Sequence, residues 1–200
     1  MNKKDRYNIA VVGATGAVGQ EMVKILAERK FPVAELGLFA SSRSKGKSVE
    51  FNGKRISIQE LSFDESSFRG IDFVLSSAGS SVSKQFVPHA IKAGAVVIDN
   101  TSAFRMDRDT PLVVPEINPE DISKHKGIIA NPNCSAIIML MAIAPLHRKN
   151  RIKRVICATY QSASGAGLRA MKELEEQSRD ILADRPIKKE AFPHQIAFNL

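Results

Sequence analysis

A glycine-rich turn between a strand-like and a helix-like segment is the feature that most constrains this sequence. Residues 8–12 are apolar and rich in β-branched side chains, which predicts a buried strand. Residues 17–30 carry apolar side chains at helical spacing. The turn at 13–19 reads Gly-Ala-Thr-Gly-Ala-Val-Gly. A strand, a tight turn and a helix in this order predict a βαβ unit that binds an anion where the helix begins.

Each glycine of the turn has a separate expected task. Gly13 allows the tight turn, Gly16 lets the backbone approach a pyrophosphate, and Gly19 permits close packing of helix on strand. The free N–H groups at the helix start, near Thr15, Ala17 and Val18, face the anion, and the helix dipole favours its charge. We therefore interpret 13–19 as a dinucleotide site; the alternative is a glycine turn of another α/β protein.

Strand-like and helix-like segments alternate along the rest of the chain. This alternation predicts an α/β fold with a Rossmann-like, mostly parallel sheet. We expect the first domain at 1–133 and the opening of a second at 134–200. Further strands are expected at 35–41, 72–78, 95–100, 127–130 and 154–161, a hairpin at 48–58, and helices at 83–94, 135–148 and 168–182.

Composition narrows the class of protein. Apolar residues make up 44% and charged residues 25% of the 200, as in ordinary globular proteins. The net charge is +8, but the basic residues are scattered, Trp is absent and Tyr occurs twice, so we discount nucleic-acid binding. The apolar run at 137–146 is too short to cross a bilayer. No signal peptide is visible, and two cysteines suggest free thiols in a reducing cytoplasm.

The end of the second expected strand bears on the choice of dinucleotide. An NAD site usually places a carboxylate there to hold the ribose 2′-hydroxyl. This chain instead has Ser41, Arg43 and Ser44, with two lysines beyond. Hydroxyl donors and positive charge suit a 2′-phosphate, which predicts NADP over NAD. The alternative is a solvated basic loop.

Cys134 is expected at the N-terminus of an apolar helix, directly after Asn133. The partial positive charge there favours a thiolate, and hence a nucleophile. Neighbouring N–H groups and the Asn133 side chain are placed to hold a developing oxyanion. The alternative is a small buried helix residue. Cys157, within the expected strand at 154–161, is interpreted as core.

Two further segments carry candidate site residues. Arg105 follows the end of a strand, where α/β sheets bind ligands, and a guanidinium suits phosphate or carboxylate. Gln161 is a candidate to position a carbonyl or thioester, and Ser164 and Gly165 allow close backbone approach to a ligand. The alternatives are a solvated arginine and an ordinary turn. None of the four histidines has the spacing of a metal site.

Six blocks of sequence, taken together, resemble the aspartate-semialdehyde dehydrogenase family. They occur in the family's order and cover nearly the whole chain. The blocks are Gly-Ala-Thr-Gly-Ala-Val-Gly at 13–19, Ser-Ser-Ala-Gly-Ser-Ser at 76–81, Val-Ile-Asp-Asn-Thr-Ser-Ala-Phe-Arg at 97–105, Pro-Leu-Val-Val-Pro-Glu-Ile-Asn at 111–118, Asn-Pro-Asn-Cys-Ser at 131–135, and Thr-Tyr-Gln-Ser-Ala-Ser-Gly-Ala-Gly at 159–167.

The resemblance implies reductive dephosphorylation of 4-phospho-L-aspartate to L-aspartate 4-semialdehyde with NADP, in lysine, threonine and methionine biosynthesis. By resemblance, Cys134 forms a thioester, Arg105 binds phosphate and Gln161 supports the acyl group. Residues 15–18, Arg43, Ser44, Ser164 and Gly165 match segments that contact NADP. The resemblance further implies a homodimer or homotetramer, with an α+β catalytic and dimerisation domain after residue 133.

One departure concerns length. Family members continue past Leu200, and their substrate-binding Glu and Arg, phosphate-site Lys and acid–base His lie in that later part. We therefore expect this chain to correspond to the N-terminal part of the family. Two alternatives stay open: N-acetyl-glutamyl-phosphate reductase, and an NADP-binding remnant without catalysis.

Overall fold

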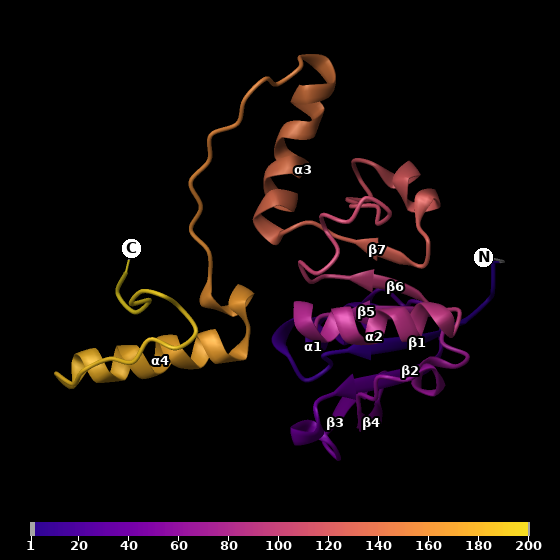
Figure 1. Ribbon diagram of the computed structural model, residues 1–200, viewed down its shortest axis with the longest axis horizontal. Helices are drawn as coiled ribbons and strands as arrows, with labels where there is room; N and C mark the ends of the chain where they lie inside the picture. The colour runs from indigo at the N-terminus through magenta and orange to yellow at the C-terminus, as the bar shows by residue number, and fades with distance from the viewer. Residues whose placement is uncertain (1–2, 200) are drawn as a thin grey trace. The chain divides into compact units, whose positions relative to one another are not determined.

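The computed structural model describes residues 3–199 (Figure 1). The chain divides into two compact units, Met1–Val155 and Ile156–Leu200. We describe each unit by itself. The expected domain boundary after residue 133 stays a prediction.

The first unit is built on a seven-stranded sheet with the strand order β3-β4-β2-β1-β5-β6-β7. Neighbouring strands run parallel, except that β3 and β4 form an antiparallel hairpin. The predicted α/β, mostly parallel fold is confirmed. The strands are β1 (Tyr7–Val12), β2 (Val33–Ala40), β3 (Ser48–Phe51), β4 (Lys54–Glu60), β5 (Phe73–Ser76), β6 (Val96–Asp99) and β7 (Ile128–Ala130).

Strand β1 lies at the centre because both of its faces are apolar. Ala10 and Val12 pack into a core that includes Phe68 and Phe86, while Ile9 and Val11 pack into a second core that includes Val23. The first core contains residues of helix α2 (Ser80–Lys92), and the second contains residues of helix α1 (Ala17–Glu28). The two helices therefore cover opposite faces of the sheet (Figure 1). This doubly wound arrangement explains why the central strand reads as a continuous apolar run.

Helix α3 (Cys134–Lys149) forms where the sequence predicts an apolar helix, but none of its residues is buried. Ile138 and Leu146 are 73% and 64% exposed. Near its C-terminus, the Arg148 guanidinium donates to the carbonyl oxygens of Glu116 and Ile117, at 3.3 and 3.4 Å. The helix thus begins directly after the sheet and makes polar contacts at its far end.

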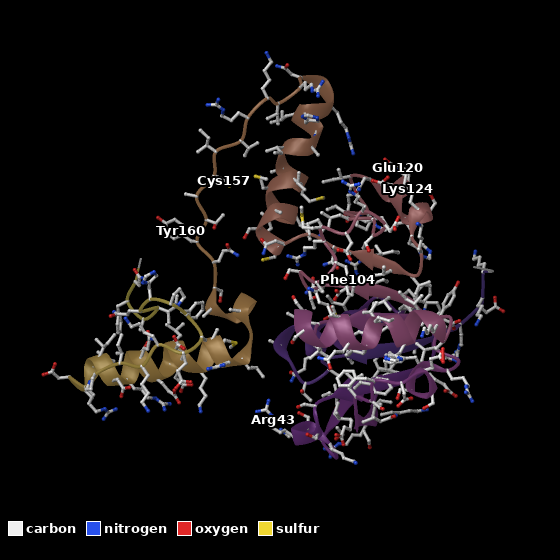
Figure 2. The ribbon with its side chains drawn as sticks, in the orientation of Figure 1. Arg43, Phe104, Glu120, Lys124, Cys157 and Tyr160 are labelled. Atoms are coloured by element: carbon white, nitrogen blue, oxygen red, sulfur yellow. The ribbon has the colours of Figure 1, made fainter. Side chains whose placement is uncertain are left out.

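The strand expected at 154–161 is not formed, and this prediction is wrong. Residues 151–162 have no regular secondary structure, and Cys157, interpreted as core, is exposed. Tyr160 is 89% exposed (Figure 2). An alternating pattern stabilises a strand only when a neighbouring strand accepts its hydrogen bonds. Among residues 3–199 no strand pairs with this segment.

The second unit consists of helix α4 (Leu168–Leu182), preceded by the short 3-10 helix η4 (Ala163–Ala166), and a segment that returns along α4. The predicted helix at 168–182 is confirmed. Its buried residues include two polar ones, Glu173 and Gln177, one turn apart. The pattern of exposed charges gave no signal that these two would be buried.

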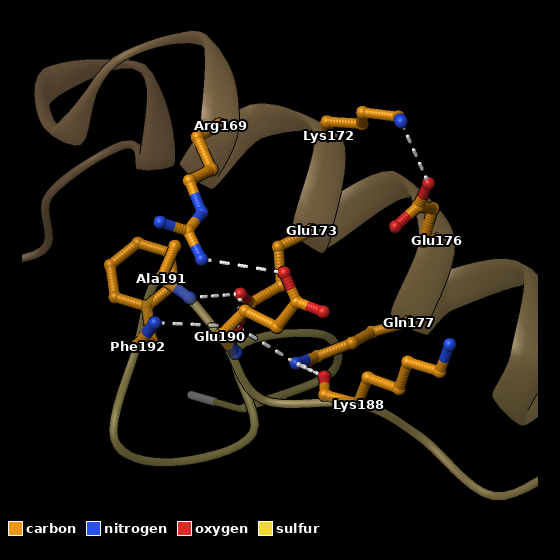
Figure 3. A network of polar contacts seen from close by, with 9 residues as sticks. All are labelled: Arg169, Lys172, Glu173, Glu176, Gln177, Lys188, Glu190, Ala191 and Phe192. Atoms are coloured by element: carbon orange, nitrogen blue, oxygen red, sulfur yellow. Dashed lines mark hydrogen bonds and ion pairs between the residues drawn. The ribbon is translucent and has the colours of Figure 1, made fainter.

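Glu173 and Gln177 bind the returning segment through its peptide groups (Figure 3). The Glu173 carboxylate accepts hydrogen bonds from the backbone N–H groups of Glu190 (2.8 Å), Ala191 and Phe192 (3.3 Å). The Gln177 amide oxygen accepts from the N–H groups of residues 196 and 197, at 2.9 and 3.2 Å, and its Nε2 donates to the carbonyl of residue 188 at 2.8 Å. These bonds hold the segment against the helix.

We expect the hydrogen-exchange protection of the returning segment to depend on pH. The backbone N–H group of Ala191, with those of residues 190 and 192, lowers the pKa of Glu173 against the opposing effect of burial. A lowered pKa stabilises the folded form above the unfolded pKa of about 4.3, and the stabilisation disappears as pH falls through the folded value. Hydrogen-exchange protection factors of the amides of residues 190–192 should therefore drop below about pH 4.

Two variants test that assignment. Glu173→Gln should lower these protection factors at neutral pH and flatten their pH dependence. Glu176→Gln is the matched control, since Glu176 lies on the exposed side of the same helix and pairs with Lys172. Equal protection in both variants would contradict the role of Glu173.

Candidate functional site

The glycine turn connects β1 to α1, and its glycines are required by close backbone approach. Gly13 has a φ of +90°, and a Cβ atom there would lie 2.8 Å from the backbone carbon and oxygen of Ser77. A Cβ at Gly19 would lie 2.8 Å from the carbonyl carbon of Gly13 and 2.9 Å from Cα of Ala14. Any larger residue at either position must displace backbone. The turn therefore brings the first helix, the first strand and the loop after β5 together.

The start of α1 is suited to an anion. Gly16 is the N-cap residue and brings no side chain to cap the first N–H groups. Ala17 and Val18 are exposed, and the first turn carries no acidic side chain. The N–H groups and the positive end of the helix dipole thus face outward without a competing carboxylate.

A cavity of about 520 Å³ lies beside this turn. It is bounded by loops that follow the carboxyl ends of β1, β2, β4 and β5, the edge at which α/β sheets bind ligands. Five of the predicted cofactor residues line it: Gly13, Thr15, Gly16, Ser41 and Arg43. The remaining lining residues are Val12, Ala40, Ser42, Glu60, Leu61, Phe63, Ser77, Ala78 and Val82.

Ser44 ties the two cofactor loops together. It belongs to the short helix η1 (Ser42–Ser44), is buried, and its Oγ lies 3.3 Å from Oγ1 of Thr15. Arg43, in the same short helix, is exposed at the edge of the cavity (Figure 2). The structure thus brings the glycine turn and the basic loop after β2 together, as the sequence predicts.

Part of the cavity lining was not predicted from the sequence. Glu60, at the end of β4, faces it and pairs with Lys45 at 3.5 Å. Leu61 and Phe63 come from the turn after β4, and Val82 from the first turn of α2. The available signal was positional only, because a turn that follows a parallel strand reaches the same edge of the sheet as the glycine turn.

A buried polar network joins the ends of β5 and β6. The Asp99 carboxyl group is fully buried and accepts from Ser83 Oγ (3.1 Å), Thr101 N (3.1 Å) and Thr101 Oγ1 (2.8 Å). Ser83 Oγ in turn lies 2.9 Å from Ser76 Oγ. The network fixes the first turn of α2 and the loop that leads to Arg105.

Arg105 connects the loops after β6 and β7. Its Nε donates to the carbonyl oxygen of Asn131 and its Nη2 to that of Asn100, each at 2.9 Å. The side chains of Asn100 and Asn131 are hydrogen bonded to each other. Arg105 therefore holds the loop that leads to Cys134, while Nη1 takes part in neither of these two bonds.

Cys134 is the first residue of α3 and is exposed. The Asn133 side-chain oxygen caps the helix by accepting from the N–H group of Ser135 at 3.0 Å. Because that oxygen faces the helix, the Nδ2 amide group of Asn133 is the part left to donate to a ligand. An accessible sulfur at a helix N-terminus satisfies the geometric requirement for the predicted nucleophile.

The remaining predicted site residues lie in the second unit. Gln161 is exposed, and its Oε1 accepts from Thr159 Oγ1 at 3.1 Å. Ser164 belongs to η4, and its N–H group donates to the Oγ of Ser162, which caps that short helix. Gly165 is exposed in the same turn. Their roles toward Cys134 and the cofactor stay predictions.

Residues 3–199 offer neither a metal centre nor a helix that could span a membrane. No group of three or more His, Cys, Asp and Glu side chains is arranged to hold a metal ion. None of the helices there has the length and apolar character needed to cross a membrane.

Comparison with known proteins decides the family. The family model described as "Semialdehyde dehydrogenase, NAD binding domain" matches residues 8–125, which contain the glycine turn and Arg105. Relatives named aspartate-semialdehyde dehydrogenase are 56% and 54% identical over 96% of the chain. The chain belongs to the aspartate-semialdehyde dehydrogenase family. A second family model, described as "Semialdehyde dehydrogenase, dimerisation domain", matches residues 143–200.

The family's relatives match nearly the whole chain. The two relatives at 56% and 54% identity are the aspartate-semialdehyde dehydrogenases of Synechocystis sp. and Aquifex aeolicus, respectively. The crystal structure of aspartate semialdehyde dehydrogenase II from Vibrio cholerae, complexed with ASA, is 48% identical over 98% of the chain with a TM-score of 0.90. A Candida albicans enzyme structure with NADP is 29% identical over 73% of the chain with a TM-score of 0.63.

The match covers part of each relative. The chain spans 56% and 57% of the Synechocystis and Aquifex proteins and 58% of the Vibrio chain. An NAD(P)-binding domain of the family is thus present, and the activity of the whole protein is a matter for proposal.

Proposed function

We propose that this chain carries the cofactor site and nucleophile of an NADP-dependent aspartate-semialdehyde dehydrogenase. The reaction is reductive dephosphorylation of 4-phospho-L-aspartate to L-aspartate 4-semialdehyde, a step toward lysine, threonine and methionine. The observation that carries the proposal is the exposed Cys134 at the start of α3, in the same unit as the glycine-lined cavity. Family membership and the relatives' names support it.

Cys134 forms the covalent intermediate. Its thiolate attacks the acyl carbon of the substrate, a C–S bond forms, the bond from that carbon to the phosphate oxygen breaks, and inorganic phosphate leaves. Nη1 of Arg105 is available to the phosphate, and Nδ2 of Asn133 to the developing oxyanion. Gln161 holds the acyl group, as the family resemblance implies. NADPH, when bound, would supply the hydride to the thioester carbon; the C–S bond then breaks, which releases the aldehyde and returns Cys134 as the thiolate.

The cavity fits a dinucleotide by two observations. Glycine at 13 and 19 permits the close backbone packing that forms the turn, and the start of α1 has no side-chain cap, so its first N–H groups are available to a pyrophosphate. Thr15, Ser41 and Arg43 then offer donors along the same cavity. We assign the pyrophosphate to the glycine turn and the adenosine ribose to the loop after β2.

We propose NADP over NAD because Arg43 offers a guanidinium where NAD sites carry a carboxylate. Arg43→Leu is expected to weaken NADP binding by about tenfold or more, since a charge-assisted hydrogen bond to the 2′-phosphate is lost. NAD binding should change little. Isothermal titration of both cofactors measures this. Lys47→Ala is the control, because Lys47 is exposed nearby but does not line the cavity. Tighter binding of NAD than of NADP by the unaltered protein would contradict the preference.

The reaction itself is tested in the oxidative direction. NADPH formation from aspartate semialdehyde should require inorganic phosphate, and N-acetylglutamate semialdehyde should be a poor substrate. Preference for the acetylated substrate would favour N-acetyl-glutamyl-phosphate reductase. Binding of NADP without phosphate-dependent turnover would reduce the proposal to a nucleotide-binding chain.

Two properties of the whole protein follow from the same proposal. The match to a dimerisation domain at 143–200 supports a homodimer or homotetramer. We place the reaction in the cytoplasm, since Cys134 must remain a free thiol to act as a nucleophile.

A further inference from the structure

An aromatic side chain outside the glycine turn lines the cofactor cavity. Phe63 lies in the turn after β4, lines the cavity and is 43% exposed. Leu61, Ala78 and Val82 line the same region. The other phenyl rings near this turn, Phe39 and Phe68, are buried in the core. Phe63 therefore presents apolar area to a concave site that also carries polar donors.

The turn that carries Phe63 is fixed from both sides. Before it, the N–H group of Leu61 donates to the carbonyl oxygen of Ala40 at 2.8 Å. After it, the Asp64 carboxylate accepts from the hydroxyls of Ser62 and Ser66 and from the N–H group of Ser67 at 3.1 Å. The Ser62 hydroxyl, followed by that of Ser66, holds the pKa of Asp64 well below its usual range, so the carboxylate stays an acceptor at neutral pH. The backbone of the turn that carries Phe63 is thus held in place before a ligand arrives.

The rest of the cavity is already assigned by its chemistry. The uncapped N–H groups at the start of α1 suit a pyrophosphate, and the hydroxyls and guanidinium at 41–43 suit a phosphorylated ribose. In the adenosine half of the dinucleotide, the part not yet assigned is a flat, apolar-faced base. A phenyl ring flanked by aliphatic side chains is the surface that such a base packs against.

We propose that Phe63 packs against the adenine ring of the bound dinucleotide and contributes directly to its affinity. This inference rests on the proposed NADP function and adds a binding residue that neither the glycine turn nor the basic loop supplies.

The ligand 2′,5′-ADP isolates the adenosine half of the cofactor for the test. Phe63→Ala should weaken its binding about tenfold, because the contact between ring and base is lost. The affinity of Phe63→Leu should lie between those of Phe63→Ala and the unaltered protein. The affinity of Phe63→Tyr should stay close to that of the unaltered protein. Ribose 5-phosphate, which has no base, should bind all four proteins equally. Isothermal titration on the 200-residue chain measures these affinities, with thermal melts to verify that each variant is folded.

The absence of Trp from the chain permits a direct optical test. Phe63→Trp introduces a single indole, and its fluorescence should be quenched saturably by 2′,5′-ADP but not by ribose 5-phosphate. Phe31→Trp is the matched control, since Phe31 is 38% exposed in the same unit and lies outside the cavity. Its fluorescence should not respond.

The outcomes separate this inference from the proposed function. If the unaltered protein does not bind 2′,5′-ADP, the nucleotide-binding function itself fails. If it binds, while Phe63→Ala binds equally well and Phe63→Trp is not quenched, the role of Phe63 is overturned and the function stands.

Discussion

Replacing Cys134 with alanine is expected to lower phosphate-dependent turnover by at least about a thousandfold, since loss of a covalent nucleophile removes the main reaction route. NADP binding should persist, because Cys134 does not line the cofactor cavity. The rate of NADPH formation from aspartate semialdehyde and phosphate measures the first effect. Titration with NADP measures the second.

The chain supplies its own control for this experiment. Cys157 is also exposed, but it lies in an irregular segment rather than at the start of a helix. Cys157→Ala should retain turnover. Mass spectrometry after incubation with the acyl phosphate should find the acyl group on the peptide that contains Cys134. Undiminished turnover in Cys134→Ala, or acylation at Cys157 alone, would reject the thioester mechanism.

Replacing Asp99 with alanine is expected to lower the free energy of unfolding by about 3 kcal/mol. The carboxyl group is fully buried, and its removal leaves the Ser83 hydroxyl and the N–H and hydroxyl groups of Thr101 without this acceptor. Buried donors without partners are costly. Urea unfolding followed by circular dichroism measures the change.

Two comparisons sharpen the Asp99 experiment. Asp99→Asn keeps one acceptor oxygen and should lower the free energy of unfolding by less than Asp99→Ala does. Asp109→Ala should change stability by less than about 0.5 kcal/mol, because the exposed Asp109 pairs with the exposed Lys126. If Asp99→Ala unfolds at the same urea concentration as Asp109→Ala, the network does not hold the loops at the ends of β5 and β6.

Local sequence patterns were sufficient to predict the strands of the first unit, because these strands pair with neighbours inside the same unit. The runs at 9–12 and 95–98 are continuous and apolar, as expected for strands covered on both faces, and both lie within the sheet. The Asn52-Gly53 turn predicted the β3–β4 hairpin. That β4 then adds to β2 in parallel was not predictable, since nothing in the hairpin specifies its neighbour.

The same reasoning failed at 154–161. The alternation there describes which side chains share a face, but not whether another strand is present to pair. The segment has no such neighbour among residues 3–199, and the side chains of Cys157 and Tyr160 are exposed.

The candidate site was predicted best where residue type alone dictates geometry. Glycine at 13 and 19 reflects backbone contacts that no other residue permits, whereas the cap that Asn133 forms on α3 was not predicted. The apolar wall at Phe63 and the attachment of Arg105 to the carbonyls of Asn100 and Asn131 depend on loops far apart in sequence. No local pattern encodes such contacts.

The hydrogen bonds between α4 and its returning segment determine which substitutions that segment tolerates. Glu173 and Gln177 contact peptide N–H and C=O groups, which every residue except proline possesses in full. Side chains along 188–197 can therefore be exchanged over evolutionary time without loss of these bonds, whereas proline at 190, 191, 192, 196 or 197 removes one. Two invariant side chains on the helix would thus accompany a segment that varies at its exposed positions and keeps a small residue at the buried position 197.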